Sequence, residues 1–254
     1  MREILGRRRF TWAWEHLSGR RLWGTSRRSP HRSSLRNAAL ACATRWHWPV
    51  VPGAAVSGKA SGKAAAAVCS CPDPDCVVPG AHPFDPVLLA ATTDESMVRW
   101  WWTNRPGAPV ILATGGRAPC AISLPAVAGA RALATFDRTG VRLGPVVATP
   151  TRFSVLVEPY GLEELGELLY AQDWVPSSLR FHGEGGYVAL PPSETGAGKV
   201  RWERQPESDG ARDGARGGAR MGEDAPWLPR METLLDVLVE ESAATPGSGS
   251  RLAY

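Results

Sequence analysis

Apolar residues recur along the chain with two spacings, which predict a succession of helices and strands. Helical spacing is clearest near the middle of the chain, where four leucines fall on one face of a segment that starts at Leu162. Such spacing, with Thr93 or Asp94 as one capping residue, predicts helices over residues 34–46, 94–103, 126–136, 162–170 and 231–243. Short apolar runs bounded by Gly or Pro predict strands over residues 48–52, 110–114, 120–124, 146–149, 153–157, 179–182 and 187–190.

The order of these elements indicates the fold class. Strands and helices alternate, which predicts an α/β or α+β domain with a mixed sheet and flanking helices. The last two strands are expected to form a hairpin around the Gly-rich residues 183–186. Tandem Asp-Gly-Ala-Arg repeats predict a linker late in the chain. The expected organisation is an arm (1–33), a folded domain (34–204), the linker (205–226), a helix (227–244) and a disordered tail (245–254).

Charge is distributed unevenly along the chain. The net charge is +4, yet residues 1–36 alone carry +8, which leaves −4 for the remainder. Attraction to a phosphate backbone is therefore expected mainly in the arm, where it would allow the protein to bind DNA or another nucleic acid. The candidate contacts are Arg7, Arg8, Arg9, Arg20, Arg21, Arg27 and Arg28.

The strongest chemical pattern is a group of metal-binding residues in a loop rich in Pro and Gly, residues 69–83. Three thiols and one imidazole, Cys69, Cys71, Cys76 and His82, fall within 14 residues. Three Cys and one His form a tetrahedral zinc ligand set, and four protein ligands close the site, so the prediction is a structural Zn²⁺.

Other residues offer alternatives to this assignment. Asp73 and Asp75 lie within the same loop and present oxygen ligands, while free surface thiols would need no metal at all. Cys42 and Cys120 lie in apolar helix and strand contexts, where an inert core cysteine is expected.

Five segments, in fixed order, carry a resemblance to a known family. They are residues 45–52 (RWHWPVVP), 79–83 (PGAHP), 91–102 (ATTDESMVRWWW), 111–115 (ILATG) and 183–193 (GEGGYVALPPS). Together they resemble the N-terminal domain of bacterial bifunctional DNA primase/polymerases, the Prim-Pol domain of the archaeo-eukaryotic primase superfamily. The resemblance covers about residues 36–203 and implies a Prim-Pol-like fold with the zinc loop inserted.

The same resemblance implies a catalytic site that this sequence lacks. Active members carry an Asp-x-Asp or Asp-x-Glu pair on the strand after the "IATG" segment, which holds divalent metal, and here that strand (residues 119–125) reads PCAISLP. A family His is missing from residues 149–154 (TPTRFS), and the place of a third carboxylate is taken by Arg180. The expected protein is a degenerate member without metal-dependent synthesis.

Binding functions are expected to remain. By the resemblance, six residues would cluster around the former nucleotide site and contact nucleotide or phosphate: Thr114, Gly115, Arg152, Arg180, His182 and Ser193. Arg180 and His182 are alternatively ordinary strand residues paired with Glu184 or Glu158. The expected role is that of an accessory or regulatory factor that binds nucleic acid, or a replication or regulatory protein in trans.

Two rival functions stay open. The chain would be an active primase or polymerase if metal ligands came from elsewhere, such as Asp137, Glu158 or Glu184. It would be a protein-interaction scaffold without nucleic acid if the Trp-rich surface at residues 100–102 and the terminal helix bound a partner. Three consecutive Trp cannot all face one core, because a helix turns by about 100° per residue, so at least one is expected to be exposed.

The cellular location follows from what the sequence contains. Its apolar stretches are shorter than the roughly 18–20 residues of a membrane span, and the Arg-rich start does not resemble a secretory signal. The expected location is the cytoplasm, with possible association with the nucleoid through the arm.

Overall fold

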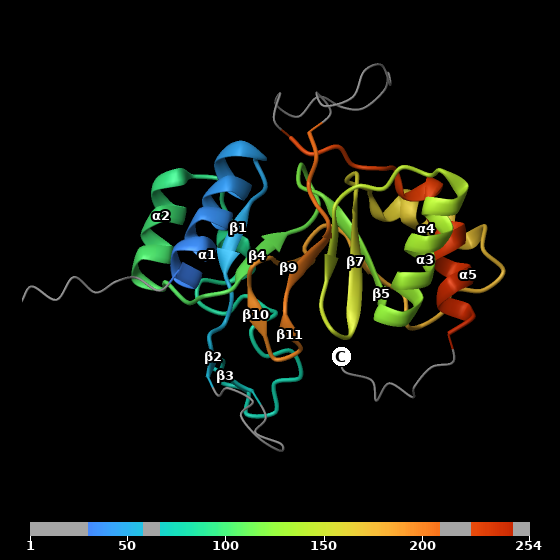
Figure 1. Ribbon diagram of the computed structural model, residues 1–254. Coiled ribbons are helices and arrows are strands. Elements are labelled where there is room, and N and C mark those ends of the chain that lie inside the picture. The colour runs from blue at the N-terminus through green and yellow to red at the C-terminus, as the bar shows by residue number, and fades with distance from the viewer. Residues whose placement is uncertain (1–29, 58–66, 209–224, 246–254) are drawn as a thin grey trace, which may run out of the picture.

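The computed structural model describes residues 30–57, 67–208 and 225–245, which form an α+β fold with two main sheets (Figure 1). The first sheet has three strands, in the order β1 (Val50–Pro52), β4 (Val110–Ala113) and β9 (Tyr187–Leu190). The second has five, in the order β12 (Arg201–Arg204), β6 (Val146–Ala148), β7 (Arg152–Val157), β5 (Cys120–Pro125) and β8 (Arg180–His182). Two short hairpins complete the strands, β2 (Val56–Ser57) with β3 (Val68–Cys69) and β10 (Glu194–Thr195) with β11 (Gly198–Lys199).

Helices lie at both ends of this arrangement, and Figure 1 shows the two sheets between them. On one side are α1 (Pro30–Leu40), which continues into a π-helical turn (Ala41–Arg45), and α2 (Glu95–Asn104). On the other are α3 (Ala126–Thr139), α4 (Leu162–Tyr170) and α5 (Leu235–Ala243). Single 3₁₀ turns occur at Leu88–Ala90 and Met231–Thr233. The α+β class with flanking helices and a Cys/His loop is confirmed.

Two hydrophobic cores follow from the alternation of side chains along β5. Ile122 and Leu124 point to the core beneath α3 and α5, whereas Ala121 belongs to the core shared with α1, α2 and the first sheet. The five-stranded sheet therefore has helices against one face and the first sheet toward the other. The large aromatic residues Trp48 and Trp102 are fully buried in the second of these cores.

Helix α2 illustrates how local sequence sets an element. Asp94 is its N-cap and accepts a hydrogen bond from the N–H of Met97 at 2.7 Å, as one of the two predicted caps. Trp101 and Trp102 are buried while Trp100 is 58% exposed, which confirms that the three consecutive Trp do not share one face.

The predicted hairpin of residues 179–182 and 187–190 is wrong. β8 pairs with β5, and β9 pairs with β4, so the two strands belong to different sheets. The turn at residues 183–186 leads the chain from one sheet to the other, because β8 pairs with the buried strand β5 and β9 pairs with the buried strand β4. All strand pairs in the described part of the chain are antiparallel, so each sheet is antiparallel rather than mixed.

Several boundaries differ from expectation. Helix α1 begins at Pro30, inside the range predicted as the arm, and proline suits the first helical position because its missing N–H has no partner there in any case. Its α-helical part ends at Leu40, six residues before the expected end. Of the predicted linker, residues 209–224 lie outside the described residues, and its two flanks meet where the N–H of Trp227 donates to the carbonyl of Glu207 at 2.9 Å.

Candidate metal centre and sheet face

The loop that carries the predicted metal ligands is fastened to the domain at several points. The N–H of Ala54 donates to the carbonyl of His82 at 2.9 Å, and the N–H of Gly196 donates to the carbonyl of Pro79 at 2.7 Å. Gly80 is buried with a φ of +74°, and a Cβ there would lie 2.3 Å from a methyl carbon of Val56, so this turn requires glycine. Backbone hydrogen bonds and one tight turn thus hold a segment that has little core of its own.

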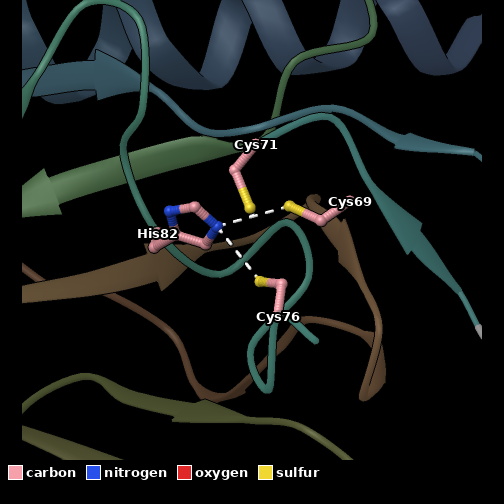
Figure 2. Close-up of side chains that lie close together, drawn as sticks. All are labelled: Cys69, Cys71, Cys76 and His82. Carbon is pink, nitrogen blue, oxygen red and sulfur yellow. Dashed lines mark hydrogen bonds between the residues drawn. The ribbon is translucent and has the colours of Figure 1, made fainter. Parts of the chain in front are cut away.

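The four predicted ligands come together at the centre of this loop (Figure 2). The Nε2 of His82 lies 3.3 Å from the Sγ of Cys69 and 3.4 Å from the Sγ of Cys76, and with Cys71 included all four ligand atoms lie within 4.8 Å of one another. A tetrahedral zinc ion, with bonds of about 2.3 Å to sulfur and 2.0 Å to nitrogen, would separate S and N by about 3.5 Å. The side chains therefore fit a metal ion.

Hydrogen bonds prepare these groups for metal binding. The Nδ1 of His82 lies 2.9 Å from the carbonyl of Pro83, which can only accept, so Nδ1 carries the proton and Nε2 keeps its lone pair for a metal. Burial raises the pKa of the Cys69 thiol, but N–H groups of Cys71 and Gly80 and the His82 side chain outweigh it and lower the pKa to about 6. One thiolate ligand is thus available at neutral pH.

The alternative oxygen ligands are not part of the cluster. Asp73 accepts a hydrogen bond from the N–H of Asp75 at 2.9 Å, and both residues are exposed. The remaining cysteines, Cys42 and Cys120, are buried in the cores, and burial raises the pKa of Cys42 to about 12. These two thiols are core residues, as expected.

A second group of polar side chains lies on the face of the five-stranded sheet that is turned away from α3 and α5. We call Ser123, Arg152, Arg180 and His182 the basic cluster. Ser123 on β5 lies opposite Arg180 on β8, and its hydroxyl is 2.9 Å from the Nε2 of His182. Arg152, from β7 on the other side of β5, donates to the carbonyls of Ser123 and Ser178, each at 2.8 Å.

Electrostatics set the charge of the basic cluster. Burial lowers the pKa of His182 to about 4, and Arg152 and Arg180 add to this effect, so the imidazole is neutral at pH 7. Burial and the charge of Arg180 lower the pKa of Arg152 to about 10, which leaves the guanidinium protonated. The cluster therefore carries two positive charges.

The other predicted phosphate-binding residues are divided between two places. The hydroxyl of Thr114 donates to the carbonyl of Gly183 at 2.7 Å, and Gly115 packs against Glu184, so both contact the turn that directly follows His182. Ser193 lies apart. It is buried beside Val110, whose N–H donates to its hydroxyl at 2.8 Å, at the opposite end of β4 from Thr114.

The rival metal ligands do not assemble in the described part of the chain. Asp137 forms an ion pair with Arg204 at 2.5 Å at the end of α3. Within the described ranges, the Cys/His loop is the one place where three or more His, Cys, Asp or Glu side chains bring ligand atoms this close together. The arginines predicted to contact nucleic acid from the arm lie outside the described residues.

Sequence reasoning missed the contacts that join the basic cluster. It predicted that Arg152, Arg180 and His182 would cluster. It did not identify the Ser123 hydroxyl, which contacts both Arg152 and His182, or the Ser178 carbonyl, which accepts a hydrogen bond from Arg152. One signal in the sequence could have indicated Ser123. Residues two apart on a strand share a face, so Ala121 and Ser123 lie on the face of β5 opposite to that of Ile122 and Leu124.

Residues 39–217 match the family model described as bifunctional DNA primase/polymerase, N-terminal, and the chain belongs to this family. Neither the curated proteins nor the solved structures contain a match. In the part of the chain that the structure describes, no helix has the length and apolar character needed to cross a bilayer.

Proposed function

We propose that this chain is a primase/polymerase-family protein that has lost catalysis and acts by binding nucleic acid, or a partner protein, as an accessory or regulatory factor. The observation that carries the proposal is the composition of one sheet face. The family resemblance assigns metal-binding carboxylates to the β5 strand and to the position of Arg180, and Ser123 and Arg180 are direct neighbours there. Neither is a carboxylate.

Chemistry explains why these residues matter. Phosphoryl transfer in this family depends on divalent ions that neutralise the developing charge, and Mg²⁺ binds through hard oxygen ligands. Ala121 and Ser123 share the relevant face of β5, and Arg180 beside them would repel a cation. An ion with no carboxylate ligand and a guanidinium neighbour has no basis for binding.

We further propose that the metal of the Cys/His loop is zinc and that its role is structural. Four protein ligands leave no open coordination position for substrate, which supports this assignment. Reduced thiols are needed for such a site, which supports a cytoplasmic location, with association with the nucleoid if the arm binds DNA.

The proposal is tested by an assay for DNA synthesis, in which we expect no activity. The full chain, incubated with primed or unprimed template, all nucleotides and Mg²⁺ or Mn²⁺, is expected to give no extension or priming above a buffer control. Asp substitution at Ser123 and Arg180 together is not expected to restore synthesis, since the groups that orient metal ligands would still be missing. An active polymerase in the same assay is the positive control.

The opposite result has a specific form. Template-dependent synthesis by the wild-type chain, abolished by alanine at Asp137, Glu158 or Glu184, would establish the rival enzyme with relocated metal ligands. A measurement of nucleic-acid binding distinguishes the scaffold alternative from the proposed function, because a pure protein-interaction scaffold would not need to bind nucleic acid.

Deletion of residues 1–29 tests the role of the arm and leaves α1 intact, because that helix begins at Pro30. Nucleic-acid affinity of the full chain is expected to fall steeply with salt, with a log–log slope of about −0.7 to −0.9 per phosphate neutralised. The deletion should remove most of this slope, because residues 1–29 carry a net charge of +6 and the rest of the chain carries −2. Fluorescence anisotropy at several salt concentrations measures it. If the deletion variant binds nucleic acid like the full chain, the contacts lie in the folded domain instead.

A further inference from the structure

Arg152 and Arg180 lack the acidic partner that several other arginines of the described domain have. Six others form ion pairs with Asp or Glu: Arg99, Arg105, Arg131, Arg201, Arg204 and Arg230. No described carboxylate pairs with Arg152 or Arg180, although the two lie on one sheet face and the charge of Arg180 contributes to lowering the pKa of Arg152. Two like charges that share a face without a counter-ion are unfavourable, so this arrangement favours an anion.

The geometry of Arg152 adds a second, independent observation. One terminal nitrogen of its guanidinium donates to the carbonyls of Ser123 and Ser178, and at 3.2 Å to the hydroxyl of Ser123. These contacts fix the orientation of the group but neutralise none of its charge. Its Nε is buried and has no hydrogen-bond partner. A half-buried guanidinium that is held by neutral groups, has an unpaired Nε–H and lacks an acidic partner is typical of a site prepared for a ligand.

The approach to this site lies over Arg180. Arg180 is exposed, Arg152 and His182 are half-buried, and Ser123 is buried beneath them. A ligand therefore meets Arg180 first and Arg152 at greater depth. Because His182 is neutral, the charge available to the ligand is that of the two guanidinium groups.

We propose that Arg152 and Arg180 form a metal-independent binding site for a terminal phosphate group. A terminal phosphate carries up to two negative charges and three acceptor oxygens, which match two guanidinium groups better than a single-charge carboxylate does. The inference rests on the proposed loss of the metal ligands, since it places an anion where a carboxylate-bearing member would hold cations. The phosphate belongs either to a nucleotide or to the 5′ end of a nucleic-acid strand.

The test measures binding of pyrophosphate and of a nucleoside triphosphate by calorimetry, in buffer freed of divalent cations without added chelator, so that the Cys/His loop keeps its metal. A short oligonucleotide with a 5′-phosphate is compared with the same oligonucleotide ending in a 5′-hydroxyl. Arg180→Ala is the test variant. Arg99→Ala is the matched control, since it removes one exposed arginine from α2, remote from the sheet face.

Binding without Mg²⁺ is expected for the wild type and Arg99→Ala, and Arg180→Ala should weaken it on the order of tenfold or more, as expected for lost charge-assisted hydrogen bonds. Preference for the 5′-phosphate, lost in Arg180→Ala, would identify a strand end, whereas binding of the triphosphate alone would identify a nucleotide. The melting temperature of Arg180→Ala should equal or exceed that of the wild type, because a like charge is removed, so weakened binding would not reflect misfolding.

Absence of binding, binding that requires Mg²⁺, or equal affinity of the two variants would overturn the site. None of these outcomes concerns synthesis of DNA. A result that contradicts the phosphate site is therefore distinct from a result that contradicts the proposed loss of catalysis.

Discussion

Replacing Cys76 by serine is expected to remove the metal and release the loop of residues 69–83 from its folded arrangement. Wild-type protein purified without chelator should contain about one zinc per chain, and the variant close to none. Structural zinc sites contribute on the order of 10 kcal/mol to local folding, far more than the few backbone bonds that fasten this loop. Elemental analysis measures the metal, and hydrogen exchange at residues 69–83 measures the loss of order.

Asp75→Asn is the matched control for this experiment. It changes an exposed side chain of the same loop that lies outside the ligand cluster, so metal content and exchange should stay at wild-type levels. Loss of zinc in Asp75→Asn would make the aspartate a ligand. A wild-type protein with almost no metal, or full zinc content after Cys71→Ser, would contradict the site itself.

The Cys/His cluster was predictable because its four residues are close in sequence. Cys69, Cys71, Cys76 and His82 fall within one loop, so the number of residues between them restricts where they can lie in space. Pro and Gly in the same loop provide the turns that the cluster needs, and Gly80 indeed adopts a positive φ. Local spacing was sufficient evidence for this site.

The basic cluster depends on strand pairing that spacing does not reveal. Arg152, Ser123 and Arg180 come from three different strands, and β8 was expected to pair with the strand that follows it rather than with β5. The turn at residues 183–186 has the composition of a hairpin tip, yet the apolar partners of β8 and β9 lie in separate sheets. Long-range burial therefore decided a pairing that local turn residues alone would assign differently.

The π-helical turn after α1 is a similar case. Residues 41–45 have ordinary helical composition, and the predicted helix ran through them without interruption. In the structure the N–H of Trp46 donates to the carbonyl of Ala41 and that of Trp48 to the carbonyl of Cys42, which leads the chain into β1 with Trp48 buried. Burial of the Trp48 side chain, rather than local helix propensity, therefore determines where the helix ends.

Gly115→Ala is expected to destabilise the protein by about 3 kcal/mol or more, because two separate effects act at this position. Gly115 has a φ of +90°, which disfavours any L side chain, and a Cβ there would lie 2.3 Å from the Cα of Glu184. The atom it meets belongs to the backbone of the turn after β8, so a side chain cannot simply rotate away. Thermal and denaturant unfolding measure the loss, with a fall in melting temperature of roughly 10 °C.

Gly116→Ala separates the two effects, because Gly116 also has a positive φ, +64°, but a Cβ there would have no neighbour within 4 Å. This variant should lose only about 1 kcal/mol, the cost of the backbone conformation alone. The difference in stability between the two variants thus measures the contact between Gly115 and the turn at residues 183–186. This contact links the end of β4 to the end of β8. If both variants lose equal stability, this contact does not hold the two sheets together; if Gly115→Ala alone also weakens pyrophosphate binding, the same turn sets the position of His182 and Arg180.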